Sequence, residues 1–458
     1  MTTFHIEQFG CRATQADGAA IERQLREQGC VAAGDPASAE VIVLNTCTVT
    51  AAADAQARDA IRKIHAANPA TRIIVTGCYA QRAPEELASL PGVTFVVGNS
   101  HKPQIPRLLH SIATAPASPQ IEAPIPYHTA PVLNGDIFAQ SEVLVAPVLG
   151  GEGNHTRPTL KIQDGCDLRC SFCVIPFVRG KSRSLPVATV LSEIQRLADS
   201  GFREIVLSGI NLGTYGRDLS PRVEFFDLLR RILADTSVER LRVSSIEPLD
   251  VTKDLVDLIA SSDRIAPHFH VPLQSASDRI LAAMHRWYRA EHYSRRVELI
   301  REQLPHAAIG ADVIAGFPGE TEADHESTLR FIEERPFTYL HVFSYSARPG
   351  TKAASLAGRI PGHVIKRRAR ELRALGDAKS EEFRRSQIGR TLRVLTLRRD
   401  PNDDPSRTSA LSGNYLSVVV CEILPPNQML TVTLNHADGK NLVGLPLEPE
   451  FAQLAEAV

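Results

Sequence analysis

The sequence predicts an α/β protein with three parts: an N-terminal parallel α/β domain, a central partial (β/α)6 barrel and a small C-terminal all-β barrel. Short apolar runs alternate with helical segments over residues 1–100 and again over 158–350, which is typical of βαβ units and parallel sheets. After a long basic helix expected over 361–386, strand-like runs are separated by loops rich in Asp, Pro and Gly. Such runs predict a small barrel.

The same patterns divide the chain of 458 residues into segments, as its length allows. We expect an N-terminal α/β domain over 1–115, a Pro- and Ala-rich linker and entry segment over 116–157, a partial barrel with the basic helix over 158–386 and a β-barrel over 387–452.

In the first segment, each predicted strand ends at a turn that leads into a cysteine. The predicted strands are Phe4–Phe9, Val41–Leu44 and Ile73–Val75, and a helix is expected over Asp17–Glu27. The cysteines that follow the strands are Cys11, Cys47 and Cys78. Since the ends of parallel strands converge on one edge of a sheet, the three thiols can meet in space. Three buried core cysteines are the alternative, and these residues alone leave it open.

Six further strands, separated by helices, are predicted in the central segment: Thr159–Gln163, Glu204–Ser208, Leu241–Ser245, His268–Pro272, Gly310–Ala315 and Tyr339–Ser344. Six repeats fit an open, partial barrel better than a closed eightfold one. In parallel α/β folds the loops at the carboxyl ends of the strands carry the site.

Composition limits the possible classes of protein. The N-terminus lacks the pattern of a signal peptide and no apolar stretch approaches a membrane span, so we expect a cytoplasmic protein without a membrane partner. Disulfides are rare there, and grouped cysteines therefore suggest metal binding or catalysis.

The net charge of −1 gives no sign of a nucleic-acid partner. The segment from Arg359 to Arg399, however, contains thirteen Lys or Arg but four Asp or Glu. A solvated helix face and a surface that binds a polyanion both explain this excess.

The strongest motif is a loop with three cysteines just past the first central strand. Cys166, Cys170 and Cys173 stand at spacings of four and three, so that their thiolates can each face a different iron of a cubane cluster. Three ligands for four irons leave one coordination position open, as a reacting metal needs. A zinc knuckle is the alternative, but no histidine nearby completes it.

This loop resembles that of the radical S-adenosylmethionine superfamily, which has an aromatic residue before the last cysteine. In this sequence Phe172 occupies that position. The resemblance implies that the open iron binds S-adenosylmethionine and that one electron releases a 5′-deoxyadenosyl radical. Binding, orienting and shielding that radical is then the role of the protein.

Nearly the whole chain resembles the methylthiotransferase family. The motifs that carry the resemblance are Asn45–Thr50, Val75–Gln81, Val174–Gly180, Gly209–Gly216, Ser244–Pro248 and Asp312–Thr321. The resemblance implies a second 4Fe–4S cluster on Cys11, Cys47 and Cys78, which supplies sulfur to a carbon activated by the radical, and a methyl group from another S-adenosylmethionine. The C-terminal module resembles the RNA-binding TRAM domain.

The residues of these motifs are most similar to those of the branch that acts on N6-threonylcarbamoyladenosine beside the anticodon of tRNA. The branches acting on isopentenyladenosine in tRNA and on an aspartate of a ribosomal protein are the alternatives. The resemblance also suggests cofactor contacts for Phe172, Glu247 and Gln274, although packing or strand-end hydrogen bonds explain these residues equally well.

Two readings from other classes stay open. One is a radical enzyme in which the N-terminal cysteines are structural, and the other is a non-catalytic iron–sulfur protein that binds RNA as a redox sensor. Phe172 and the strand-end motifs argue against the sensor. The sequence does not identify the electron donor, the sulfur donor or the oligomeric state. If the basic helix binds phosphates, we expect four arginines to make the contacts: Arg367, Arg368, Arg384 and Arg385.

Overall fold

The computed structural model describes residues 2–114, 129–140, 143–144, 147–148, 156–400 and 403–447. Most of the linker expected over 116–157, and the end of the segment expected over 387–452, lie outside the described residues. The chain divides into two compact units. Unit 1 comprises Met1–Val148, Leu160–Ser184 and Ser346–Ala354, and unit 2 comprises Leu149–Thr159, Leu185–Tyr345 and Ser355–Val458.

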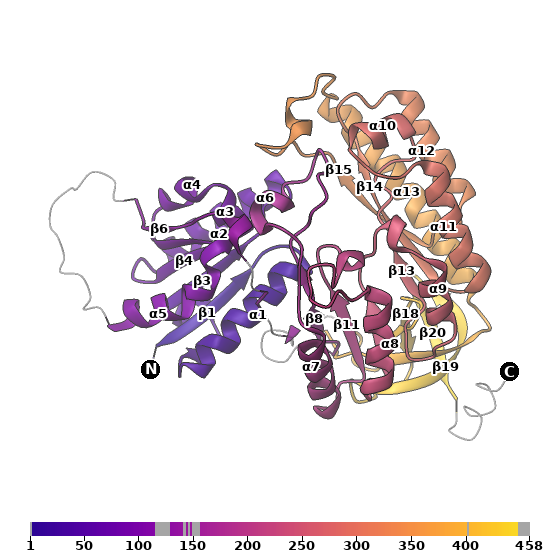
Figure 1. Cartoon of the computed structure of the whole chain (residues 1–458). Coiled ribbons are helices and arrows are strands. Elements are labelled where there is room, and N and C mark those ends of the chain that lie inside the picture. Colours follow the sequence, from indigo (N-terminus) through magenta and orange to yellow (C-terminus); the bar gives the residue numbers. More distant parts are fainter. Residues whose placement is uncertain are drawn as a thin grey trace. The chain divides into compact units, whose positions relative to one another are not determined.

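Unit 1 contains a six-stranded parallel sheet in the order β2-β1-β3-β4-β5-β6 (Figure 1). Its strands are β1 (Thr3–Gln8), β2 (Val31–Ala32), β3 (Val41–Thr46), β4 (Arg72–Gly77), β5 (Val93–Gly98) and β6 (Val132–Leu133). Its helices are α1 (Arg12–Glu27), α2 (Ala51–Ala67), α3 (Cys78–Arg82), α4 (Pro84–Ala88) and α5 (Ile105–Thr114), with the 3-10 turns η1 (Pro36–Ser38), η2 (Asn99–Gln104) and η3 (Ile137–Ala139).

Helices cover both faces of this sheet, and its strands are therefore apolar on both sides. In β3, Ile42 and Leu44 belong to one core cluster, whereas Val41 and Val43 belong to the other. This explains why the strand is a continuous apolar run rather than an alternating one. The three predicted strands are confirmed. Helix α1 begins at Arg12 rather than at the expected Asp17. The sequence did not reveal this start, because the first turn is polar and Cys11, which precedes it, makes no side-chain cap.

The predicted strand over 159–163 is split in two. It forms β8 (Thr159–Lys161) and β9 (Gln163–Asp164), which pairs antiparallel with β10 (Arg183–Ser184). A loop and α6 (Ile175–Arg179) lie between β9 and β10.

The other five predicted central strands are confirmed in unit 2 as β11 (Glu204–Ser208), β12 (Arg240–Val243), β13 (His268–His270), β14 (Ala308–Ala315) and β15 (Tyr339–Ser344). Strands β11 and β12 pair in parallel, β13–β15 form a parallel sheet, and a bridge between Ser245 and His270 links the two groups. The helices of this unit are α7 (Val187–Asp199), α8 (Phe225–Asp235), α9 (Lys253–Ala260), α10 (Asp278–Ala283), α11 (Ala290–Gln303), α12 (Glu322–Glu334) and the basic helix α13 (Gly362–Ser386).

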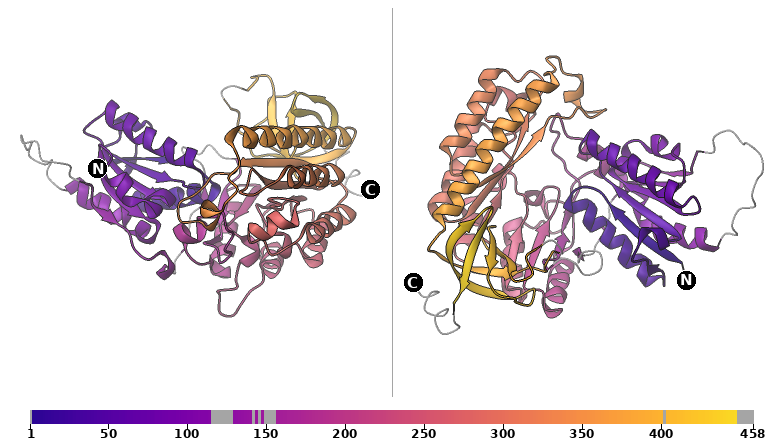
Figure 2. Two further views of the ribbon diagram at one scale, coloured as in Figure 1. Left: turned by 90° about the horizontal axis from the view of Figure 1, so that it is seen from above. Right: turned by 180° about the vertical axis from the view of Figure 1, so that it is seen from behind.

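A closed β-barrel follows α13 in unit 2 (Figure 2). Its strands are β16 (Thr391–Thr396), β17 (Thr408–Ser412), β18 (Ser417–Val420), β19 (Met429–Asp438) and β20 (Asn441–Pro446). Val394, Val420, Val432 and Leu442 fill its interior. The α/β class, the partial barrel and the small all-β barrel are thus all as predicted from the sequence. Strands β17 and β20 were missed, since each mixes apolar with small or polar residues.

Candidate metal centres

The loop with Cys166, Cys170 and Cys173 lies in unit 1, between β9 and α6. The N–H of Cys166 donates to Gly180 O at 3.1 Å, and the N–H of Cys173 donates to Cys170 O at 3.1 Å. Gly165 has φ +72, and a Cβ there would lie 1.9 Å from Lys181 O. Only glycine therefore permits this close turn into the first cysteine.

A distant segment holds the middle of the same loop. The carbonyl oxygen of Ser171 accepts a hydrogen bond of 2.8 Å from the N–H of Ala353, which belongs to the same unit. Cys166 is buried, whereas Phe172, Cys170 and Cys173 are half-buried. The three thiols thus lie on one short, tethered loop, and two of them have partial access to solvent.

The second set of cysteines follows three adjacent strands of the unit 1 sheet. Cys11 comes after β1, Cys47 follows β3 directly and Cys78 is the first residue of α3 after β4. Strand order reverses between β1 and β3, and the crevice at such a switch point is where open α/β sheets bind ligands. Cys47 and Cys78 are buried and Cys11 is exposed.

Gly10 shows how closely these strand ends approach one another. It has φ +106, and a Cβ there would lie 2.3 Å from Cys47 Cβ and 2.8 Å from Cys47 Sγ. Burial, and after it the nearby charges of Cys78 and Cys11, raise the pKa of Cys47 to about 11. The ionisation of Cys47 is therefore influenced by both Cys11 and Cys78.

Helix packing connects the two sets of cysteines within unit 1. Cys78 forms one buried cluster with Val174 and Val178, so α3 packs on the helix that directly follows Cys173. In addition, Asn99 Nδ2 donates to Val178 O at 2.7 Å and lies 3.6 Å from Cys78 Sγ.

The donor chemistry of both sites fits an iron–sulfur cluster. Each set offers three thiols on turns, and thiolates are the ligands of such clusters. Near the second set, Arg179 Nε is buried with no hydrogen-bond partner among the described residues. An unpaired buried N–H is costly, and an anionic group beside it would remove that cost.

The remaining predicted cofactor contacts lie in unit 2. Glu247 follows β12 and forms an ion pair with Arg286. Burial raises its pKa, although Arg286 opposes this effect. Gln274 has φ +65, and its backbone N–H donates to Asp312 O at 2.7 Å. Trp287, in contrast, is 72% exposed.

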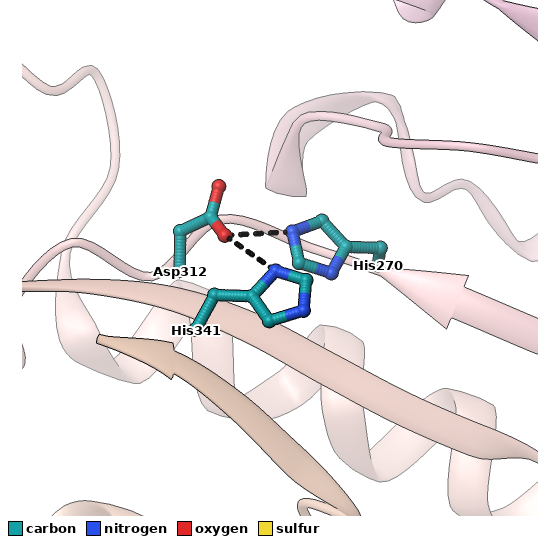
Figure 3. A group of neighbouring side chains, drawn as sticks. All are labelled: His270, Asp312 and His341. Atoms are coloured by element: carbon teal, nitrogen blue, oxygen red, sulfur yellow. Dashed lines mark hydrogen bonds and ion pairs between the residues drawn. The ribbon is translucent and has the colours of Figure 1, made fainter. Parts of the chain in front are cut away.

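A group of polar side chains inside unit 2 was not predicted as a site. His270, Asp312 and His341 come from β13, β14 and β15 (Figure 3). His270 Nε2 and His341 Nδ1 lie 2.9 Å and 3.4 Å from Asp312 Oδ1. His270 is buried, whereas the side chain of His341 is 54% exposed.

Hydrogen bonds explain this group without a metal ion. Tyr339 OH lies 3.1 Å from His270 Nδ1 and 2.8 Å from His268 Nε2. With one choice of tautomers, His268 donates a hydrogen bond to Tyr339, Tyr339 donates one to His270, and His270 donates one to Asp312. The alternation His268-x-His270 on one strand face was the signal that could have revealed it.

The arginines of α13 do not all face solvent. Arg368 is buried and donates to Glu320 Oε2 at 2.8 Å, so the expectation that it contacts phosphate is wrong. Arg367 forms ion pairs with Glu322 and Glu371. The helix uses these two arginines to bind neighbouring segments, while Arg385 is exposed and pairs with Glu381 along the helix.

Among the described residues, no helix is both long enough and apolar enough to span a membrane.

Two family models match the chain. Residues 3–98 match Uncharacterized protein family UPF0004 and residues 160–332 match the Radical SAM superfamily. Among solved structures, a radical S-adenosylmethionine methyltransferase, TsrM from Kitasatospora setae, has a TM-score of 0.56 at 17% identity and covers 77% of each chain. This likeness concerns the fold.

Curated relatives match over most of their length. Threonylcarbamoyladenosine tRNA methylthiotransferase MtaB of Aquifex aeolicus is 39% identical over 414 residues, 90% of this chain and 95% of that protein. The protein with the same name in Bacillus subtilis is 34% identical, over 92% and 90% of the two chains. The tRNA-2-methylthio-N(6)-dimethylallyladenosine synthase of Thermobifida fusca is 34% identical, over 96% and 88%.

Proposed function

Because this chain belongs to the radical S-adenosylmethionine methylthiotransferase family, we propose that it adds a methylthio group to carbon 2 of N6-threonylcarbamoyladenosine in tRNA. The observation that carries the proposal is the 39% identity to a relative named for this substrate, over 95% of its length. Relatives named for dimethylallyladenosine match at 33–34% identity and make that nucleoside the second candidate.

The enzyme uses S-adenosylmethionine and 4Fe–4S clusters. We propose that one cluster is held by Cys166, Cys170 and Cys173, and the other by Cys11, Cys47 and Cys78. When bound, the first supplies the electron that cleaves S-adenosylmethionine, and the second supplies sulfur. The contact between α3 and α6 supports a short path between the two.

The chain's own side chains have the task of holding and orienting the cofactor and the base. In this proposal Phe172 contacts the adenine of S-adenosylmethionine. Glu247 and Gln274, at the ends of successive strands, accept or donate hydrogen bonds to its polar groups. The ion pair with Arg286 fixes the Glu247 carboxylate in one orientation, which reduces the entropy lost on binding.

For RNA recognition we propose the closed barrel of β16–β20, which keeps its expected role as the TRAM-like module, and the exposed end of α13. The anticodon stem-loop is the expected region of the tRNA. A tRNA substrate is in keeping with a cytoplasmic enzyme, as expected from the sequence.

Nucleoside analysis tests the substrate directly. We expect tRNA from cells without this gene to lack 2-methylthio-N6-threonylcarbamoyladenosine and to accumulate the unthiolated nucleoside, and a plasmid copy to restore the product. A copy with Cys170→Ala should not restore it. Loss of the methylthio group from isopentenyladenosine instead would select the second candidate, and no change in either nucleoside would refute a tRNA substrate.

A further inference from the structure

Five charged side chains lie buried together in unit 1, on five different elements. They are Asp17 of α1, Lys102 of η2, Lys161 of β8, Asp164 of β9 and Arg179 of α6, and we call them the buried charge cluster. Asp17 forms ion pairs with all three cations, at 2.8 Å to Lys102 Nζ and 3.1 Å to Arg179 Nη2. Asp164 binds Lys161 Nζ and Arg179 Nη1, each at 2.9 Å.

The buried charge cluster has more cations than anions. Among the described residues, two carboxylates face these three cations, and the buried Arg183 also places Nη2 3.9 Å from Asp164 Oδ2, so that positive charge exceeds negative charge. Burial lowers the pKa of Lys102, and Arg179 lowers it further although Asp17 opposes both. A cavity of about 20 Å³ lies beside the group, room for about one water molecule. Burying an uncompensated charge is costly, so an anion beside the buried charge cluster would be stabilising.

The N-terminal cysteines are in the right place to provide that anion. Thr14 Oγ1 lies 3.6 Å from Cys11 Sγ and 3.4 Å from Arg179 Nη2, so one hydroxyl connects a thiol to the buried charge cluster. Lys102 Nζ also donates a hydrogen bond of 3.4 Å to Asn45 Oδ1, and Asn45 stands two residues before Cys47. These thiols are the ones proposed above to hold the second iron–sulfur cluster.

We propose that the buried charge cluster is the counter-charge of the N-terminal iron–sulfur cluster and that its surplus cation raises the reduction potential of that cluster. The proposal rests on the proposed function, through the assignment of Cys11, Cys47 and Cys78 as ligands. A 4Fe–4S cluster on three thiolates is anionic and gains a further negative charge on reduction. A nearby positive charge therefore favours the reduced form, and net charge is among the factors that set such potentials.

The test isolates the N-terminal cluster in the full chain, by replacing Cys166, Cys170 and Cys173 with alanine. After anaerobic reconstitution with iron and sulfide, the midpoint potential is measured by dye-mediated titration with electron paramagnetic resonance and visible absorption. In this background Lys102→Met should disfavour one-electron reduction about tenfold, which lowers the midpoint by about 59 mV. Lys102→Arg keeps the charge and should leave the midpoint within a small fraction of that shift.

Asp17→Asn removes a negative charge from the same group and should shift the midpoint in the opposite direction. A purely structural role would not give shifts of opposite sign. Unchanged midpoints in Lys102→Met and Asp17→Asn, with iron content retained, would overturn the inference while leaving the ligands intact. If Lys102→Met holds no iron, the Asp17→Asn shift alone decides. Failure of the background variant itself to bind about four irons would overturn the ligand assignment, and the inference with it.

Discussion

The carboxylate of Glu204 should be among the most important single groups for the stability of unit 2. It is fully buried, and it accepts hydrogen bonds from Arg240 Nε at 2.5 Å, from Arg242 Nε at 2.7 Å and from Arg157 Nη1 at 3.3 Å. Two of these arginines also reach the C-terminal barrel. Arg240 donates to the carbonyls of Arg393 and Leu411, and Arg242 donates to those of Ser412 and Gly413.

Replacing Glu204 with Gln removes the negative charge and leaves the arginines buried without it. Breaking a buried ion pair in this way costs about 3–5 kcal/mol, and we expect a loss of this size in the free energy of unfolding of unit 2. Urea unfolding followed by circular dichroism measures it. Glu291→Gln is the matched control, since its pair with Arg295 is exposed and such pairs contribute about 0–1 kcal/mol.

The effect has a defined pH dependence. Burial raises the pKa of Glu204, but Arg242 and Arg240 outweigh it and hold the pKa well below its usual value of 4.5. A lowered carboxyl pKa gives stability that is complete above the unfolded pKa and is lost as pH falls through the folded one. The difference between the wild type and Glu204→Gln should therefore be constant above about pH 5 and shrink in acid. A loss below about 1 kcal/mol at pH 7, or a difference that grows in acid, would refute the reasoning.

Two further predictions concern the metal centres and RNA. Gly10→Ala should lower the iron content from about eight to about four per chain, because its Cβ would collide with Cys47. Gly29→Ala, also at positive φ but facing open space, should keep all the iron, and equal iron in both variants would contradict the account. Replacing Arg384 and Arg385 with Ala should weaken tRNA binding and reduce its salt slope by about 0.7 per lost phosphate contact. Arg368→Ala should instead destabilise the protein, and a salt slope lowered only by Arg368→Ala would contradict the assignment.

Local pattern was sufficient to predict most of the fold. Strands such as Val41–Thr46 and Ala308–Ala315 are buried on both faces and therefore stand out as apolar runs. The weaker strands β17 and β20 owe their place to closure of the barrel, a non-local constraint that no short window of sequence contains.

The cysteines were visible for two different reasons. The spacing of Cys166, Cys170 and Cys173 is itself a motif, whereas Cys11, Cys47 and Cys78 are connected only by the topology of the sheet. The buried charge cluster was not predicted, because residues such as Asp17, Lys102 and Arg179 meet across long stretches of chain. The same holds for Arg368, whose partner Glu320 is 48 residues away.

The most direct test of the two-cluster account is a product assay with a cysteine variant. Reduced protein is incubated with S-adenosylmethionine and tRNA that carries N6-threonylcarbamoyladenosine, and mass spectrometry quantifies 5′-deoxyadenosine and the methylthiolated nucleoside. We predict that the wild type forms both products, and that Cys47→Ala still forms 5′-deoxyadenosine but no methylthiolated nucleoside. Methylthiolation by Cys47→Ala at the wild-type level would contradict the account, because sulfur would then not depend on the N-terminal cysteines.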